Sequence, residues 1–413
     1  MAVTQKEIDG LVHSAAELAT PLASGAFRVE HGWGVAVDAG DVVAVGPDRE
    51  LRERFRAREE WDAAGGLIVP GFVDAHTHPV FVGTREDEFE LRTRGASYVE
   101  IARSGGGILA SMRGVRAASR EELLERLLLR LDRFLELGTT TIEAKSGYGL
   151  SLESELKCLE VIAEANRRHA VDLVPTFLGA HDVPPEYSGR KDDYVRLVME
   201  EMLPRVAQDR LAEYCDVFTE SHVFGLDDTR HIGSRAAELG MGLRLHVDQL
   251  TALGGAELAA ELGAASADHL EFVSPAGIEA LAAGGVVPVL CPLVPLYLRV
   301  EREAPARRMI DAGLAPALAT DFNPGSCPLQ SMPEVLTWAA LRYRMTAAEA
   351  LGAATLNAAA SLGRAHAIGS IEEHKRADLL VLDLENHRQL VYEFGRNPVR
   401  AVIKAGKRAW TRA

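Results

Sequence analysis

The sequence predicts an α/β protein, a TIM-like (β/α)8 barrel plus a small β-sandwich domain formed by the N- and C-terminal segments. Two patterns support this prediction. Apolar, strand-like runs alternate with helical patterns over roughly 300 residues in the middle of the chain, which is typical of an α/β barrel. Both ends of the chain are instead rich in short strands and turns. An open parallel sheet is the alternative arrangement of the middle segment.

The two ends of the chain carry the signals for the small domain. Residues 35–45 contain two apolar runs around an Ala-Gly-Asp turn, which predicts a hairpin. Residues 377–383 and 399–403 have the same strand-like character near the C-terminus. We therefore expect residues 1–66 and 367–413 to form one discontinuous β domain, with residues 67–366 forming the barrel.

The middle segment supplies the strands and helices of the barrel. Strand-like runs occur at 67–73, 139–144, 173–178, 217–219, 243–247, 264–267, 286–290 and 317–319. The clearest helix is 120–137, where leucines recur at i, i+3 and i+4. Ser119 and Glu122 form a predicted capping box before it, and Gly138 supplies the stop. Residues 152–168 and 345–351 are further predicted helices.

Composition and charge exclude several classes of protein. Of the 413 residues, 47% are hydrophobic and 25% are charged, so disordered, collagen-like and coiled-coil chains are excluded. A net charge of −15 argues against a nucleic-acid or anionic membrane partner, because both need a positive surface. Residues 280–298 are uncharged and long enough to cross a bilayer, but three prolines favour a buried strand and a loop.

The cysteines and the N-terminus indicate where the protein works. Cys158, Cys215, Cys291 and Cys327 are widely spaced, with no C-x-x-C pair, and a chain of this length needs no disulfides. The N-terminus also lacks the apolar segment of a secretory signal. We expect a cytoplasmic protein with reduced thiols.

Potential metal ligands follow four of the predicted strands. His76 and His78 come just after residues 67–73, and side chains at i and i+2 of an extended chain point the same way. An isolated His-x-His is in some proteins only a plain strand-to-loop junction. However, His246, His269 and Asp321 also end strand-like runs, where barrel active sites are built. We predict His76, His78, His246 and Asp321 as metal ligands, a set that suits Zn or Fe better than Mg or Ca.

Several longer segments resemble one family. The order His-x-His, His, His, Asp on successive strands is similar to the metal-dependent amidohydrolase superfamily. Within it, the sequence resembles the imidazolonepropionases. The matching segments are THPVFVGTR (77–85), KSGYGL (145–150), FLGAHDVP (177–184), LGGAEL (253–258) and ATDFNPGS (319–326). The resemblance covers nearly the whole chain.

This resemblance implies a reaction and a cofactor. The family opens the ring of 4-imidazolone-5-propanoate by hydrolysis, giving N-formimino-L-glutamate in histidine degradation with a metal-activated water. It implies one Zn2+ or Fe ion per subunit. Superfamily members with two metal ions carry a bridging lysine after the fourth barrel strand, here residues 216–219, and this chain has none there.

The resemblance also implies roles for individual residues. It assigns Arg85 to the substrate carboxylate and Tyr148 and His181 to the ring, and it places Asn323, Gly325 and Ser326 against substrate and product. His269 and Asp321 carry the catalytic roles. The family can have Glu where this chain has Gln249, and glutamine cannot act as a base, so we assign Gln249 to substrate binding. Several assignments have a plainer alternative. Arg85 could be a solvated surface arginine, Tyr148 an aromatic packed on the barrel rim, and His181 a structural histidine at a strand end. Residues 323–326 could form an ordinary Asn-Pro-Gly turn.

Two other functions compete with this one. A deaminase of an aromatic base would use the same metal site but has less use for Arg85. A non-catalytic scaffold barrel would be expected to lose metal ligands, and all four are present here. The expected partners are the small-molecule substrate and water, with no nucleic acid and no membrane. A homodimer is plausible on general grounds.

Overall fold

The computed structural model describes residues 5–97, 100–101 and 104–412. The chain divides into two compact units. One comprises Met1–Ala75, Asp132–Thr141 and Ser331–Ala413, and the other comprises His76–Leu131 and Ile142–Gln330. No helix in the described part of the chain is both long enough and apolar enough to span a bilayer.

Strands from the two chain ends form two sheets. The four-stranded sheet has the order β5-β4-β1-β6, and the six-stranded sheet has the order β18-β17-β16-β7-β2-β3. Their bounds are β1 (Lys6–His13), β2 (Glu17–Pro21), β3 (Phe27–Glu30), β4 (Trp33–Asp38), β5 (Asp41–Pro47), β6 (Phe55–Asp62), β7 (Leu67–Pro70), β16 (Leu379–Leu382), β17 (Val399–Lys404) and β18 (Lys407–Thr411). Strand β7 pairs with β2 on one side and with the C-terminal β16 on the other. The predicted association of the two chain ends is therefore confirmed.

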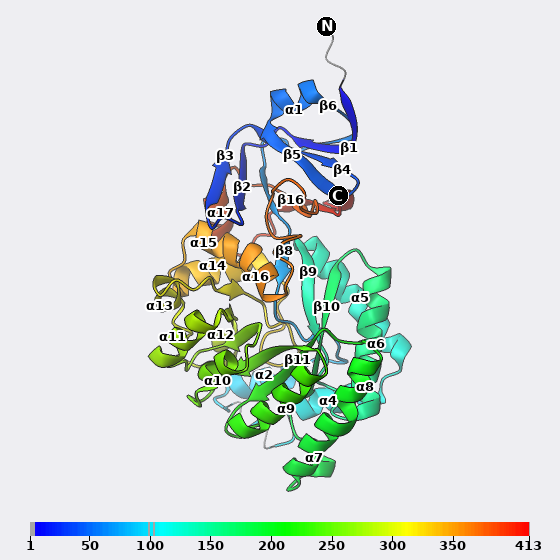
Figure 1. The fold of residues 1–413 in the computed structure, drawn as a ribbon, viewed down its shortest axis with the longest axis vertical. Coiled ribbons are helices and arrows are strands. Elements are labelled where there is room, and N and C mark those ends of the chain that lie inside the picture. Colours follow the sequence, from blue (N-terminus) through cyan, green and yellow to red (C-terminus); the bar gives the residue numbers. More distant parts are fainter. Residues whose placement is uncertain (1–4, 98–99, 102–103, 413) are drawn as a thin grey trace. The chain divides into compact units, whose positions relative to one another are not determined.

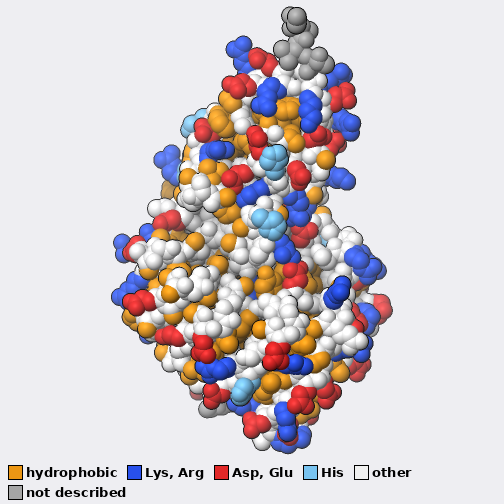
Figure 2. All heavy atoms as spheres, viewed as in Figure 1, with side chains coloured by type: hydrophobic (Ala, Val, Ile, Leu, Met, Phe, Trp, Pro, Cys, Tyr) orange, Lys and Arg blue, Asp and Glu red, His pale blue; other side chains and the backbone are white. Residues whose placement is uncertain are grey.

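The two sheets share one apolar core. Val12 and Trp61 of the first sheet belong to the same buried cluster as Ile68, Leu379 and Ile403 of the second. The predicted hairpin is also present, because β4 and β5 are antiparallel and turn at Ala39 and Gly40, which both have positive φ. On the face shown in Figure 2, acidic and basic side chains are interspersed.

The middle of the chain forms the predicted near-closed barrel. Its eight-stranded sheet has the order β15-β14-β13-β12-β11-β10-β9-β8, and β10 to β15 pair in parallel with their neighbours. The bounds are β8 (Phe72–Asp74), β9 (Thr139–Lys145), β10 (Asp172–Ala180), β11 (Tyr214–Thr219), β12 (Gly242–Val247), β13 (Ser266–His269), β14 (Val287–Leu290) and β15 (Ala317–Leu318). An isolated parallel β-bridge pairs Thr77, which follows β8, with Phe322, which follows β15.

Helices flank the strands, with α6 against β10 and α9 against β11 (Figure 1). The helices described in the structure are α1 (Asp48–Arg54), α2 (Glu86–Thr93), α4 (Ile108–Ala117), α5 (Arg120–Glu136), α6 (Leu152–Arg168), α7 (Lys191–Leu197), α8 (Leu203–Gln208), α9 (Leu226–Glu238), α10 (Gly255–Glu261), α11 (Pro275–Gly284), α12 (Val294–Leu298), α13 (Ala306–Asp311), α14 (Met332–Arg342), α15 (Ala347–Ala353), α16 (Leu356–Ser361) and α17 (His387–Tyr392). A 3₁₀ turn lies at Pro185–Tyr187, and a π-helical turn at Val198–Met202 joins α7 to α8. The Ser119 hydroxyl accepts the Glu122 N–H, as a helix cap requires.

The structure differs from the sequence prediction at residues 67–73. That apolar run is two strands, β7 and β8, which belong to different sheets and meet at Gly71. A side chain at 71 would lie only 2.4 Å from the Thr140 hydroxyl oxygen, so the chain passes here only because the residue is glycine. The four cysteines are buried and free, and residues 280–298 comprise the end of α11, β14 and α12.

Candidate metal centre and substrate pocket

His76, His78 and Asp321 converge beyond the ends of β8 and β15. The Nε2 atoms of the two histidines lie 3.3 Å apart, and Asp321 Oδ1 lies 3.4 Å from that of His76 and 3.3 Å from that of His78. Four ligand atoms set tetrahedrally about 2.05 Å from one ion would be about 3.3 Å apart. The three donors therefore have the spacing that a single bound zinc-like ion requires.

His246, the penultimate residue of β12, completes the group. One ring nitrogen from each of His76, His78 and His246 lies within 4.8 Å of the others, and all three side chains are buried. The His76 and His246 ring centroids are 4.4 Å apart. Three imidazoles and one carboxylate thus surround one small volume.

The protonation states of these residues suit a cation site. Burial lowers the pKa of His78 and of His246, so both imidazoles are neutral and keep a lone pair. Burial alone would raise the pKa of Asp321, but its contacts with His76 and His78 outweigh that effect and hold the pKa well below its usual range. Burial and Lys145 lower the pKa of His76, yet its contacts with Asp268 and Asp321 raise it to about 9. At neutral pH His76 is therefore protonated, and a metal ion bound at its Nε2 would displace that proton.

Two buried carboxylates lie behind the histidines. Asp268 Oδ2 lies 2.6 Å from His76 Nδ1, and Asp216 Oδ2 lies 2.8 Å from His246 Nδ1. The hydrogen bond to Asp268 leaves Nε2 of His76 as the coordinating atom and fixes the plane of that ring, while Asp216 lies close to His246 Nδ1 without hydrogen-bond geometry. The sequence analysis did not identify either carboxylate.

Those carboxylates belong to a buried ion network. Lys145 Nζ lies 2.7 Å from Glu143 Oε1, 2.7 Å from Asp216 Oδ2 and 3.6 Å from Asp268 Oδ2. Arg244 Nε lies 2.9 Å from Glu143 Oε1. The sequence contained a signal for this network. Glu143 and Lys145 on β9 are two residues apart, as are Arg244 and His246 on β12, so the side chains of each pair point to the same face of their strand.

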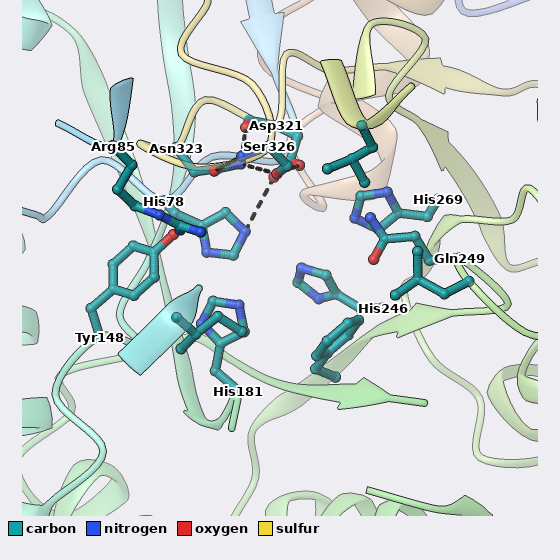
Figure 3. A pocket seen from close by; sticks show the side chains of 14 residues that line it. His78, Arg85, Tyr148, His181, His246, Gln249, His269, Asp321, Asn323 and Ser326 are labelled. Carbon is teal, nitrogen blue, oxygen red and sulfur yellow. Dashed lines mark hydrogen bonds and ion pairs between the residues drawn. The ribbon is translucent and has the colours of Figure 1, made fainter. Parts of the chain in front are cut away.

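A pocket opens above the metal group (Figure 3). It is lined by His78, Arg85, Ile108, Tyr148, His181, Phe218, His246, Gln249, Leu250, His269, Leu298, Asp321, Asn323 and Ser326. The structure thus brings most of the predicted site residues together. Two are not in the lining, His76 and Gly325, and Gly325 borders a neighbouring pocket.

The loop after β15 is held by its own hydrogen bonds. Asp321 has a left-handed backbone (φ 51°), and the Ser326 hydroxyl lies 3.1 Å from its Oδ2. Asn323 Oδ1 accepts the N–H groups of Gly325 and Ser326 at 2.8 and 2.7 Å. The Asp321 carboxylate therefore has one oxygen toward the histidines and the other toward Ser326.

The loop after β12 presents Gln249 to the pocket. Asp248, with φ 50°, accepts four backbone N–H groups at the start of α10. The buried Glu220 accepts the N–H of Leu250 at 2.6 Å. These two acids fix the backbone on both sides of Gln249, whose amide lies beside His269 in Figure 3.

His181 and Tyr148 form the opposite wall of the pocket. His181 Nδ1 donates to the Gly147 carbonyl at 2.9 Å, so Nε2 is left as a hydrogen-bond acceptor. Burial, reinforced by His78, lowers the pKa of His181 to about 3, and the ring therefore stays neutral. It stacks on His78 with centroids 5.0 Å apart, and the Tyr148 ring lies 5.3 Å from it.

Arg85 is largely buried at the edge of the pocket. Its Nε and Nη2 donate to Glu88 Oε2 at 3.0 and 2.6 Å. In Figure 3 the Tyr148 hydroxyl points toward the Arg85 guanidinium. A guanidinium at this depth has little competing water, which strengthens its attraction for an anionic ligand.

His269 ends β13 beside the metal group. Its φ of 80° is left-handed, as is the φ of 69° at Leu270, and such strained backbone clusters at functional sites. The ring centroid lies 5.0 Å from that of His76. Behind it, the buried Glu271 places Oε1 3.9 Å from His269 Nδ1. The sequence analysis also missed this carboxylate.

Comparison with known proteins identifies relatives of the chain. The model of the amidohydrolase family matches residues 67–409. The chain is 49% identical to the imidazolonepropionase of Geobacillus kaustophilus, over 95% of this chain and 93% of that protein. It is 51% identical to the imidazolonepropionase of Solibacter usitatus, over 91% and 90% of the two chains. A zinc-bound adenosine deaminase of Xanthomonas campestris has the same fold, with a TM-score of 0.73 and 23% identity over 98% of this chain and 93% of that one.

Proposed function

This chain belongs to the amidohydrolase family and, within it, to the imidazolonepropionases, and from that premise we propose its reaction and the residues that perform it. The reaction is hydrolytic ring opening of 4-imidazolone-5-propanoate to N-formimino-L-glutamate, a step in histidine degradation. The observation that carries the proposal is the pocket itself, in which a metal-ligand group and a buried arginine face one another.

His76, His78, His246 and Asp321 would hold one Zn2+ or Fe ion per subunit. Their buried, mutually close donor atoms fit such an ion, as described above. A bound ion of this kind supplies Lewis acidity and lowers the pKa of water toward about 7. Asp268 keeps the His76 ring in the orientation that coordination needs.

Asp321 and His269 carry the catalytic roles. Asp321 is ionised, and its Oδ2, held by Ser326, accepts the proton of the attacking water and delivers it to the leaving ring nitrogen. His269, on the adjacent wall, stabilises the charge that develops on the carbonyl oxygen. Gln249 binds the ring through its amide, which donates and accepts hydrogen bonds. It has no role as a base, because an amide cannot take up a proton at neutral pH.

The remaining pocket residues bind and orient the substrate. Arg85 binds the propanoate carboxylate, and a charge-assisted contact of this kind contributes about 1.5–3 kcal/mol. His181 Nε2 accepts a ring N–H, Tyr148 covers the ring, and Asn323 and Ser326 border the product. The protein works in the cytoplasm with the substrate and water as its partners, without nucleic acid or membrane, and a homodimer is the proposed assembly.

The test is an assay of the metal-reconstituted protein on 4-imidazolone-5-propanoate. We expect loss of imidazolone absorbance, and we expect Arg85→Ala to raise KM about 10- to 100-fold with little change in kcat. Unchanged kinetics would remove Arg85 from the site. Ammonia release from purines or pyrimidines, without ring opening of the imidazolone, would favour a deaminase instead.

A further inference from the structure

We propose that Gly325 is a positioning residue for Arg85. The missing side chain at position 325 gives the guanidinium its place at the edge of the pocket, so the residue acts on ligand binding through Arg85. This inference rests on the proposed role of Arg85 in binding the substrate carboxylate.

The space above Gly325 is filled by the Arg85 guanidinium. A Cβ atom at position 325 would lie 2.1 Å from Nη1, 2.4 Å from Cζ and 2.8 Å from Nη2 of Arg85. All three distances are far shorter than a van der Waals contact. The guanidinium therefore lies directly on the 325 backbone, and any side chain at that position would exclude it.

Both backbone groups of Gly325 already have a partner within the protein. Its N–H donates to Asn323 Oδ1 at 2.8 Å, and its carbonyl accepts from Arg92 Nη2 at 2.7 Å. It borders the neighbouring pocket and is absent from the lining of the site. The expected contact of Gly325 with substrate or product remains a prediction.

A clash at position 325 would move Arg85 rather than the loop. Gly325 has no left-handed φ, so alanine is compatible with its backbone. The loop is fixed by the Asn323 bonds and by the buried Arg92. The guanidinium is the end of a flexible side chain and gives way more easily.

Glu88 limits where the displaced guanidinium could go. Glu88 Oε2 accepts from Nε and Nη2 of Arg85, while Oε1 accepts the Gly107 N–H at 3.1 Å. Arg85 is thus held between the Glu88 carboxylate on one side and the 325 backbone on the other. Moving it away from position 325 also disturbs the Glu88 pair.

The test is a double-mutant cycle of Gly325→Ala and Arg85→Ala on the metal-reconstituted protein. We expect Gly325→Ala to raise KM for 4-imidazolone-5-propanoate about tenfold, with kcat and metal content within twofold of the wild type. In the Arg85→Ala background the same change should have no further effect on KM. Binding of 3-(imidazol-4-yl)propanoate should weaken in parallel, whereas binding of 4-methylimidazole, which lacks the carboxylate tail, should not.

Gly46→Ala is the matched control, because a Cβ there meets no atom within 4 Å. Additive effects of the two substitutions, or equal weakening of both imidazoles, would show that Gly325 acts on the ligand or the fold directly and would overturn the proposal. If Gly325→Ala fails to fold, adding Arg85→Ala should restore folding, and failure to do so would also overturn it. This stability comparison needs no substrate, so it separates failure of this inference from failure of the proposed reaction.

Discussion

At the scale of single residues, burial has opposite effects on two neighbours in the chain. It lowers the pKa of His181 to about 3 and raises the pKa of Asp182 to about 6, because in both cases the charged form loses its hydration. The neutral His181 ring therefore presents an unprotonated Nε2 to the pocket as a hydrogen-bond acceptor. The identity of such residues can be read from the sequence, but their burial cannot.

Asp182→Asn should stabilise the protein above about pH 6. The folded pKa of Asp182 is raised from 3.8 to about 6, so its contribution to stability is present below pH 3.8 and is lost as the pH rises through 6. Asparagine avoids burying the charge and can still accept the Val183 N–H. We expect the free energy of unfolding to rise by up to about 3 kcal/mol at pH 7.5, with little change at pH 3.5.

Urea unfolding at the two pH values measures this effect. Asp311→Asn, at a largely exposed carboxylate, is the control and should change stability by less than about 0.5 kcal/mol. A destabilised Asp182→Asn protein at pH 7.5 would contradict the prediction.

At the scale of elements, alternation along each strand decides which side chains meet inside the barrel. The pairs Glu143/Lys145 and Arg244/His246 are two residues apart, so each pair projects to one side of its strand. This local rule makes inward-facing charges predictable in principle. Which carboxylate meets which cation also depends on strand order, which brings Lys145 and Asp216 within 2.7 Å.

Lys145→Met should strongly destabilise the protein. The change removes the cation shared by three buried carboxylates, of Glu143, Asp216 and Asp268, and leaves Arg244 to compensate their charges. We expect the free energy of unfolding to fall by about 3–5 kcal/mol in urea titrations at pH 7. Lys191→Met, which breaks a half-exposed pair with Asp228, should cost no more than about 1 kcal/mol. Equal losses for both variants would show that the buried ion network contributes no more to the free energy of unfolding than a surface ion pair does.

At the scale of the whole molecule, strand pairing links the two ends of the chain. Strand β7 lies between β2 and β16, so the N-terminal and C-terminal segments share one sheet. The sequence predicted this association from two β-rich termini. The domain boundaries at residues 66 and 367 remain a prediction, since the position of a boundary depends on contacts that no single segment encodes.

Metal binding should stabilise the folded chain. A ligand that binds only the folded state adds about 2.7 kcal/mol at a concentration one hundred times its Kd. We expect zinc to raise the thermal unfolding temperature of chelator-treated protein, and we expect His246→Ala to abolish that rise. His231→Ala, at an exposed histidine, is the control. An undiminished rise in the His246→Ala protein would place the stabilising ion elsewhere.

The sequence by itself determined that strands and helices alternate in the middle of the chain and that His76, His78, His246 and Asp321 lie at or just after strand ends. Periodicity and strand direction are local properties, and they suffice to place these residues at one end of a barrel. Only the tertiary structure decided that Asp268 contacts His76 across 192 positions of sequence, and that the Arg85 guanidinium lies on the Gly325 backbone. Contacts of this kind depend on how strands and loops distant in sequence pack together, and no local pattern contains that information.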